Sequence, residues 1–158
     1  MNITLIGIVG YTFLLITALV YDLRKMIIPN WLTYPGIILA LLFCFLTGVE
    51  TSDIILRMIL TGGLFLGTSL LTSVILKKET MGGGDIKLIT MIGLYKGWQE
   101  GLLIIFFSAV SALISVIIIS VLKKGKQDDR IPFGFYIGIC ALFYEGLELL
   151  NLIQFQSD

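Results

Sequence analysis

The sequence predicts an all-α polytopic membrane protein with six transmembrane helices, the fourth of them short and both termini outside. Of its 158 residues, 57% are hydrophobic and only 14% charged, with 17 glycines against 3 prolines. This composition is typical of proteins that cross a membrane several times. Charged residues also divide the chain into apolar runs that reach the roughly 20 residues a bilayer requires. We expect residues 1–158 to form a single membrane-embedded domain.

The first three spans follow from runs with few or no charges. Residues 3–21 carry no charge and lack both a basic start and a small-residue cleavage site, so we expect a retained helix rather than a removed signal peptide. Residues 31–49 form a second span, with Asn30 as its N-cap. A third fits within 54–76, where only Arg57 interrupts near one end. Two further apolar runs predict the fifth and sixth spans, 101–122 and 131–153.

The fourth span is shorter than the others. Only ten residues separate Asp85 from Lys96, and as helix they cover about 15 Å, half of the roughly 30 Å hydrocarbon core. Two arrangements could make up the difference. Either the glycines at 82–84 enter the membrane as irregular backbone lining a wet cavity, or the helix runs on past Lys96 through Trp98. Both arrangements place Asp85 beside a hydrated pocket.

The distribution of basic residues predicts the orientation. Nine of the eleven Lys and Arg residues fall in the loops after spans one, three and five or at the start of span four, and only Arg57 and Lys96 fall on the other side. The positive-inside rule places the nine in the cytosol and both termini outside. Asp22, at the end of span one, and Asp85, at the start of span four, then share the cytosolic side and can converge. The nine residues are Arg24, Lys25, Lys77, Lys78, Lys87, Lys123, Lys124, Lys126 and Arg130.

The composition also excludes several kinds of site. The chain has no histidine, so a histidine-based metal site, a Ser-His-Asp triad and a Cys-His pair are excluded. Cys44 and Cys140 lie 96 residues apart without a C-x-x-C spacing, so we interpret both as small buried residues rather than zinc ligands. The formal net charge is zero, which gives nucleic-acid binding no electrostatic support. We expect neither a metal nor a cofactor.

Two aspartates are the candidate catalytic residues. Asp22 stands in Tyr21-Asp22-Leu23-Arg24, and Asp85 follows Gly82-Gly83-Gly84. An ionisable residue close to lipid is a functional-site hypothesis by default, because a carboxylate in hydrocarbon costs at least a few kcal/mol. Two neighbouring carboxylates can hold one proton between them, so that one activates water while the other donates to a carbonyl oxygen. That is the chemistry of an aspartyl protease.

Each feature also has a structural alternative. Asp22 beside Arg24 could form an ordinary interfacial ion pair, and three glycines could form a flexible turn. The turn explains the glycines but not Asp85. Glycine also lets another extended backbone approach closely, which makes Gly82, Gly83 and Gly84 candidate substrate-binding residues. Asp85 near a helix N-terminus is stabilised as an anion, whereas a neighbouring carboxylate opposes its ionisation.

A small ion-coupled transporter is the alternative from another functional class. Asp22 and Asp85 would then bind a cation or relay a proton, as intramembrane carboxylates next to broken helices do in transporters. A transporter, however, needs a route through the membrane. Both aspartates lie on one side, and no ionisable residue marks the middle of the other spans.

The aspartates belong to a longer series of motifs. Asp22-Leu23-Arg24 precedes Ile28-Pro29-Asn30, the segment from Gly82 to Leu88 reads Gly-Gly-Gly-Asp-Ile-Lys-Leu, and Ile131-Pro132-Phe133-Gly134 follows. Together they resemble the type IV prepilin peptidase family of GxGD membrane aspartyl proteases over nearly the whole chain. The presenilin-like branch shares G-x-G-D and a Tyr-Asp pair, but the Ile-Pro-Asn segment and the six-span layout match prepilin peptidases better.

The resemblance implies a multi-pass endopeptidase of the cell (inner or cytoplasmic) membrane. Such an enzyme removes the short basic leader of single-span prepilin-like precursors at the cytosolic face, with Asp22 and Asp85 as its two catalytic aspartates. The family's precursors serve pili, secretion, DNA uptake or archaeal filaments, and the residues do not distinguish among these pathways or fix the oligomeric state.

Two features depart from the family pattern. Many bacterial members carry a cytosolic segment with four cysteines ahead of the first aspartate and also N-methylate the new N-terminus. This sequence shows neither that segment nor its cysteines, so we expect no methyl transfer and a closer likeness to short peptidase-only members, including archaeal preflagellin peptidases. Phe135 also stands where the family often has proline after Phe-Gly.

Overall fold

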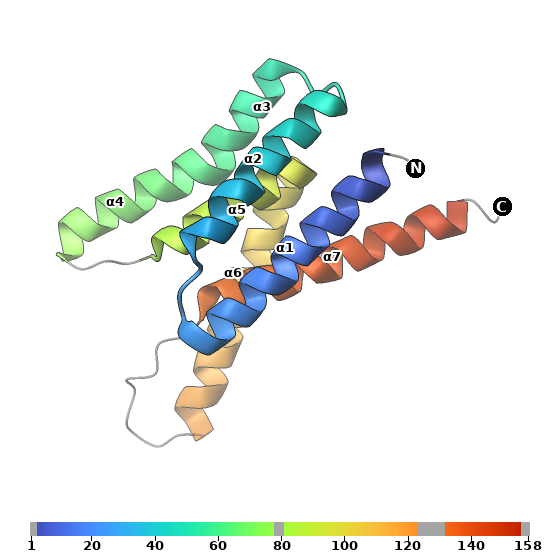
Figure 1. The fold of residues 1–158 in the computed structure, drawn as a ribbon. Helices are drawn as coiled ribbons and strands as arrows, with labels where there is room; N and C mark the ends of the chain where they lie inside the picture. Colours follow the sequence, from blue (N-terminus) through green and yellow to red (C-terminus); the bar gives the residue numbers. More distant parts are fainter. Residues whose placement is uncertain (1–2, 78–80, 123–131, 156–158) are drawn as a thin grey trace.

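The protein is a bundle of helices in which one short helix is surrounded by longer ones (Figure 1). The computed structural model describes residues 3–77, 81–122 and 132–155. Within these ranges there is no β-strand, which confirms the all-α prediction. In chain order the helices are α1 (Ile3–Lys25), α2 (Asn30–Leu46), α3 (Thr51–Arg57), the π-helical η1 (Met58–Gly63), α4 (Leu64–Leu76), α5 (Gly83–Lys96), α6 (Trp98–Leu122) and α7 (Phe133–Phe155).

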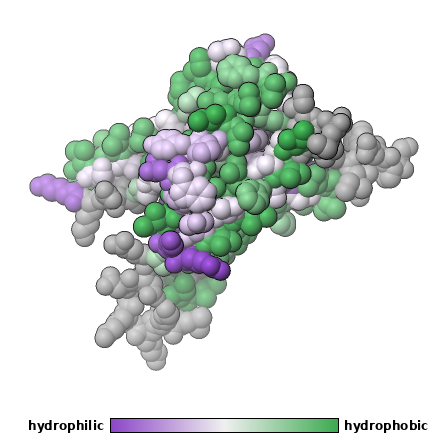
Figure 2. Space-filling model, viewed as in Figure 1, coloured by the Kyte–Doolittle hydropathy of each residue, from purple (hydrophilic) through white to green (hydrophobic). Residues whose placement is uncertain are grey.

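Four helical stretches in the described ranges are long and apolar enough to cross a membrane: Ile6–Lys25, Thr51–Leu76, Trp98–Val121 and Phe133–Leu150. The second of these is the continuous rod formed by α3, η1 and α4 (Figure 1). Helices α2 and α5 are shorter, with 17 and 14 residues. On the face shown in Figure 2, hydrophobic side chains surround a central region of intermediate and hydrophilic residues. Extensive apolar surface is expected where a protein contacts lipid. The count of six spans and the side of each terminus remain predictions.

Helix α5 lies at the centre of the bundle. It packs against α2, η1, α6 and α7, while α1 packs along α7. Its side chains Ile89, Ile92 and Leu94 are completely buried. Because α5 holds Asp85 in its first turn, this burial fixes the carboxylate relative to the surrounding helices.

Glycines allow η1 to pack closely on α5. A Cβ atom on Gly62 would lie 2.4 Å from the hydroxyl oxygen of Thr90, and one on Gly93 would lie 2.3 Å from Cγ2 of Thr61. Neither position has room for a larger residue. Small residues at helix crossings are the usual means by which helices approach one another in lipid.

The ends of α5 differ from both predicted arrangements. Gly83 and Gly84 are already helical, so the glycines extend the helix rather than forming irregular backbone. The helix then ends at Lys96 and does not continue through Trp98, because Gly97 adopts φ = 112°, a left-handed conformation that stops it. The 14 residues span about 21 Å.

The start of α2 also differs from the prediction. Asn30 is the first helical residue and not its N-cap, because Pro29 occupies the cap position with extended backbone and no side chain caps the helix. The Asn30 side-chain oxygen instead accepts a hydrogen bond of 2.6 Å from the Nζ atom of Lys87 on α5. This bond links the start of α2 to the first turns of α5.

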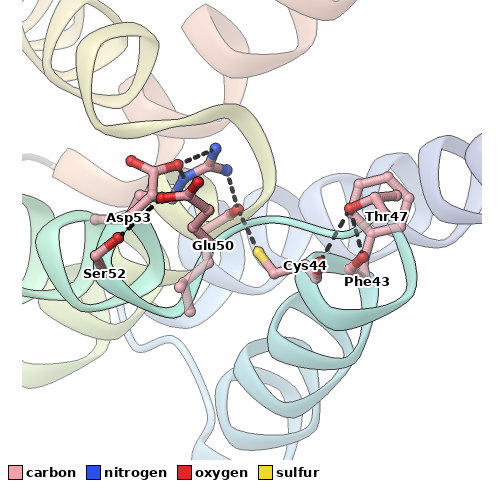
Figure 3. Close-up of polar contacts among 8 residues, drawn as sticks. Phe43, Cys44, Thr47, Glu50, Ser52 and Asp53 are labelled. Carbon is pink, nitrogen blue, oxygen red and sulfur yellow. Dashed lines mark hydrogen bonds and ion pairs between the residues drawn. The ribbon is translucent and has the colours of Figure 1, made fainter.

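The carboxyl end of α5 is held by polar contacts from two other helices (Figure 3). The carbonyl oxygen of Leu94 accepts hydrogen bonds from an Arg57 nitrogen at 3.0 Å and from Cys44 Sγ at 3.2 Å. Arg57 also pairs with Asp53 at 2.7 Å. Cys44 is buried, as predicted, while Cys140 is only partly buried. Arg57 therefore satisfies a carbonyl at the end of a buried helix.

Candidate active site

Asp22 and Asp85 meet at one position of α7. A Cβ atom on Gly134 would lie 2.9 Å from Oδ2 of Asp22 and 2.9 Å from Oδ1 of Asp85. The two carboxylate oxygens are therefore at most twice 2.9 Å apart, although 63 residues separate them in sequence. The structure brings the two predicted aspartates together around the bare Cα of Gly134.

Asp22 is held in place from outside its own helix. It lies near the carboxyl end of α1, where the helix dipole disfavours a negative charge. Its Oδ2 atom accepts a hydrogen bond of 2.8 Å from the backbone N–H of Phe135, in the first turn of α7. The positive end of α7 thus offsets the unfavourable end of α1. Only 4% of Asp22 is exposed, so the bond also satisfies a buried polar group.

Asp85 is more accessible. It occupies the first turn of α5, where free backbone N–H groups favour a negative charge, and it is partly buried. A Cβ atom on Gly82 would lie 3.3 Å from its Oδ2 atom. Each carboxylate is thus placed at a helix N-terminus, Asp85 at that of its own helix and Asp22 at that of α7. The more exposed carboxylate faces the glycines that precede it.

The loop between α1 and α2 packs under both aspartates. A Cβ atom on Gly84 would lie 2.9 Å from Ile28 Cβ and 3.1 Å from the Ile28 carbonyl oxygen, and one on Gly134 would lie 2.7 Å from Ile28 Cδ1. Ile28 is buried between the first turns of α5 and α7. It therefore fixes the distance between the two helix ends that position the carboxylates.

The three glycines before Asp85 have different surroundings. The space beside Gly84 is occupied by Ile28 of the same chain, so close packing within the protein already accounts for a glycine there. Gly82 and Gly83 are exposed, and a Cβ atom on Gly83 would have no neighbour within 4 Å among the residues that the structure describes. The role of these two glycines in substrate binding stays a prediction.

Two contributors to the site were not singled out from the sequence. Gly134 belongs to the Ile-Pro-Phe-Gly motif, but nothing local indicated that it lies between the carboxylates. The Phe135 N–H is a backbone group, and its side chain was noted only as a departure from proline. Proline has no N–H to donate, so phenylalanine at this position provides a hydrogen bond that proline lacks. No group of three or more potential metal ligands occurs in the part of the chain that the structure describes.

Comparison with known proteins assigns the family. A model of the type IV leader peptidase family matches residues 8–117, which include both aspartates. The chain belongs to the type IV leader peptidase family. It is 33% identical over 135 residues to a prepilin leader peptidase/N-methyltransferase of Aeromonas salmonicida and 32% identical over 135 residues to that of Aeromonas hydrophila. Each of these alignments covers 82% of this chain and 45% of the relative.

A shorter match adds a third relative. The prepilin leader peptidase/N-methyltransferase of Pseudomonas aeruginosa is 42% identical over 65 residues, which is 40% of this chain and 22% of the relative. The chain spans about half the length of the Aeromonas relatives. No solved structure matches it significantly.

Proposed function

We propose that the protein is a membrane aspartyl endopeptidase that removes the short basic leader from type IV prepilin-like or preflagellin-like precursors. The observation that carries this proposal is the convergence of Asp22 and Asp85 on Gly134. The names of the relatives supply the substrate class. The transporter alternative receives no support from the comparisons.

The proposed mechanism uses the two carboxylates as an acid–base pair. One is ionised and removes a proton from a water molecule as that water attacks the scissile carbonyl carbon. The other is protonated and donates to the carbonyl oxygen. When the resulting gem-diol collapses, the C–N bond breaks. The carboxyl group that took the proton from water gives it to the leaving amine, while the other carboxylate takes a proton from the diol, so the pair returns to its starting state. Two carboxylates this close do not both ionise readily, so the pair can hold one proton in the resting state. The hydrogen bond from the Phe135 backbone N–H keeps the Asp22 carboxylate in position while the proton moves.

Substitution of each aspartate tests the proposal. Asp22→Asn and Asp85→Asn preserve the shape of the side chain but remove its acid–base function. We expect each to reduce cleavage of a purified prepilin-type precursor at least 10³-fold, the upper part of the range for losing an acid or base. Glu50→Gln, at an exposed position outside the site, is the matched control and should cleave normally. Substantial activity in either aspartate variant would remove that residue from the mechanism.

The proposed topology places this site in the cytosol. We propose six spans with both termini outside, because nine of the eleven basic residues then face inward. In a background lacking Cys44 and Cys140, Lys77→Cys should resist a membrane-impermeant thiol reagent in intact cells, whereas Glu50→Cys should react. Both positions are exposed in the structure. The opposite labelling pattern would place the aspartates outside the cell.

A further inference from the structure

A second group of charged side chains lies at the other end of α5. Nζ of Lys96 forms ion pairs with Glu145 and, at 2.7 Å, with Glu148, both on α7. The Lys96 and Glu145 side chains are 11% and 4% exposed, whereas that of Glu148 is 51% exposed. Lys96 lies eleven positions after Asp85, or about 16 Å along the helix axis. This cluster is therefore separate from the aspartate pair.

The cluster borders a cavity of about 320 Å³. Three aromatic side chains form one wall: Tyr11 of α1, Phe43 of α2 and Tyr95 of α5. The ring centroid of Tyr95 lies 4.8 Å from that of Tyr11 and 5.4 Å from that of Phe43. Apolar side chains of Ile8 and Leu149 complete the lining. The volume lies at the lower end of the range of small-molecule sites, so the cavity can hold a group of several non-hydrogen atoms.

One residue that lines the cavity, Tyr11, carries a buried hydroxyl without a described partner. Tyr11 is 1% exposed, and its hydroxyl has no hydrogen-bond partner among the residues that the structure describes. A buried hydroxyl without a hydrogen-bond partner is energetically unfavourable. Lys96 lies over the Tyr11 ring, 5.5 Å from its centroid, so the ammonium and the phenol share one wall. A ligand that accepts a hydrogen bond at this wall would satisfy the hydroxyl.

The charged and polar side chains beside the cavity best match a ligand that carries both a positive and a negative group. The Tyr11 hydroxyl and the Lys96 ammonium are donors that match an anionic oxygen. Glu145 and Glu148 are acceptors and carry two negative charges against one positive charge on Lys96, so a simple anion would be repelled. A simple cation would leave the Tyr11 hydroxyl proton without an acceptor. A zwitterion that combines a phosphate with an ammonium group satisfies donors and acceptors together.

We propose that this cavity binds the headgroup of a phospholipid carrying a primary ammonium, with its phosphate at Tyr11 and Lys96 and its ammonium at Glu148. The lipid is favoured over a free zwitterion because the cavity lies in a bundle whose helices are long enough to cross a membrane. Ile8 and Leu149 also offer apolar contact to the first carbons of an acyl chain. A primary ammonium donates hydrogen bonds to carboxylates, which the trimethylammonium of a choline lipid cannot do.

Lipid selectivity of the unmodified protein is the first test. The purified full chain in detergent is titrated with dioleoyl phosphatidylethanolamine, phosphatidylglycerol or phosphatidylcholine, and bound lipid is measured by native mass spectrometry. We expect the ethanolamine lipid to bind at least about fivefold more tightly than the other two. Equal affinities for the three lipids would overturn the proposal. Free phosphoethanolamine binding as tightly as the lipid would show a soluble ligand and overturn the lipid assignment.

Two variants locate the lipid in the cavity. Tyr11→Phe removes only the hydroxyl and should weaken binding of the ethanolamine lipid about fivefold to tenfold, the loss expected for one buried hydrogen bond. Glu148→Gln should reduce the preference for ethanolamine over choline lipid. Tyr34→Phe and Glu50→Gln make the same chemical changes at exposed positions outside the cavity and should bind as the unmodified protein does. Unchanged lipid binding in Tyr11→Phe and Glu148→Gln would refute the assignment to this cavity.

Discussion

Gly134→Ala should weaken the proposed precursor cleavage by displacing Asp22 and Asp85. The added methyl group would lie 2.9 Å from a carboxylate oxygen of each of Asp22 and Asp85 and 2.7 Å from Ile28 Cδ1, whereas ordinary contacts of Cβ begin near 3.4 Å. Each carboxylate must therefore move by about 0.5 Å. Because a misplacement of about 1 Å can cost 10²-fold in rate, we expect a loss of roughly tenfold in kcat/KM for precursor cleavage.

The matched control for this change lies on the same helix. Gly146→Ala adds the same methyl group to α7 where no atom of the described residues lies within 4 Å. Replacing glycine by alanine inside a helix favours folding by roughly 0.5–1 kcal/mol, so the control should keep full activity and an equal or higher unfolding temperature. Both variants are assayed with one purified precursor, and unfolding is followed by circular dichroism. Full activity in Gly134→Ala would refute the placement of both carboxylates around this glycine.

Two further predictions concern the helix that holds Asp85. Gly84→Ala should reduce both cleavage and thermal stability, with an overpacking cost of about 1–3 kcal/mol against Ile28. Gly83→Ala meets no atom within 4 Å in the part of the chain that the structure describes, so it should fold normally, and equal stability of the two variants would contradict the packing. Arg57→Gln should lower the free energy of unfolding by about 1–2 kcal/mol, because the charge-assisted hydrogen bond to the Leu94 carbonyl at the end of α5 is lost. As a control, Ser52→Ala at an exposed position should change that free energy by less than about 0.5 kcal/mol. Equal unfolding free energies in denaturant titrations of those two variants would show that the bond contributes nothing.

The sequence predicted the long helices well because each is a continuous apolar run. The ends of α5 were predicted less well. Three successive glycines suggest a break, yet α5 begins at Gly83, and Ile28 packs against Gly84 in its first turn. Gly97 ends the helix because its φ is positive. The sequence contains many glycines and does not show which of them adopts a positive φ. Contacts distant in sequence thus surround the first boundary, whereas the local backbone of Gly97 sets the second.

The site was predictable only in part. The pairing of the two aspartates could be predicted from their motifs and from the distribution of Lys and Arg residues, which places both aspartates on the same side of the membrane. The contribution of α7 could not, because the bond from Phe135 to Asp22 joins residues 113 positions apart and uses a backbone N–H common to nearly all residues. Tyr11 likewise reads as one apolar residue among many, and its unsatisfied hydroxyl is visible only once α1, α5 and α7 are packed together.

The shortness of α5 has a consequence for the interior of the bundle. At about 21 Å, the helix is roughly 9 Å shorter than a typical hydrocarbon core. Residues 88–94 of α5 are buried against other helices, so its ends border the inside of the bundle rather than lipid. Polar groups at membrane depth are tolerated where they line a water-filled cavity. Asp85 lies at one end of α5, so water that enters the bundle at that end reaches the aspartate used in the proposed hydrolysis.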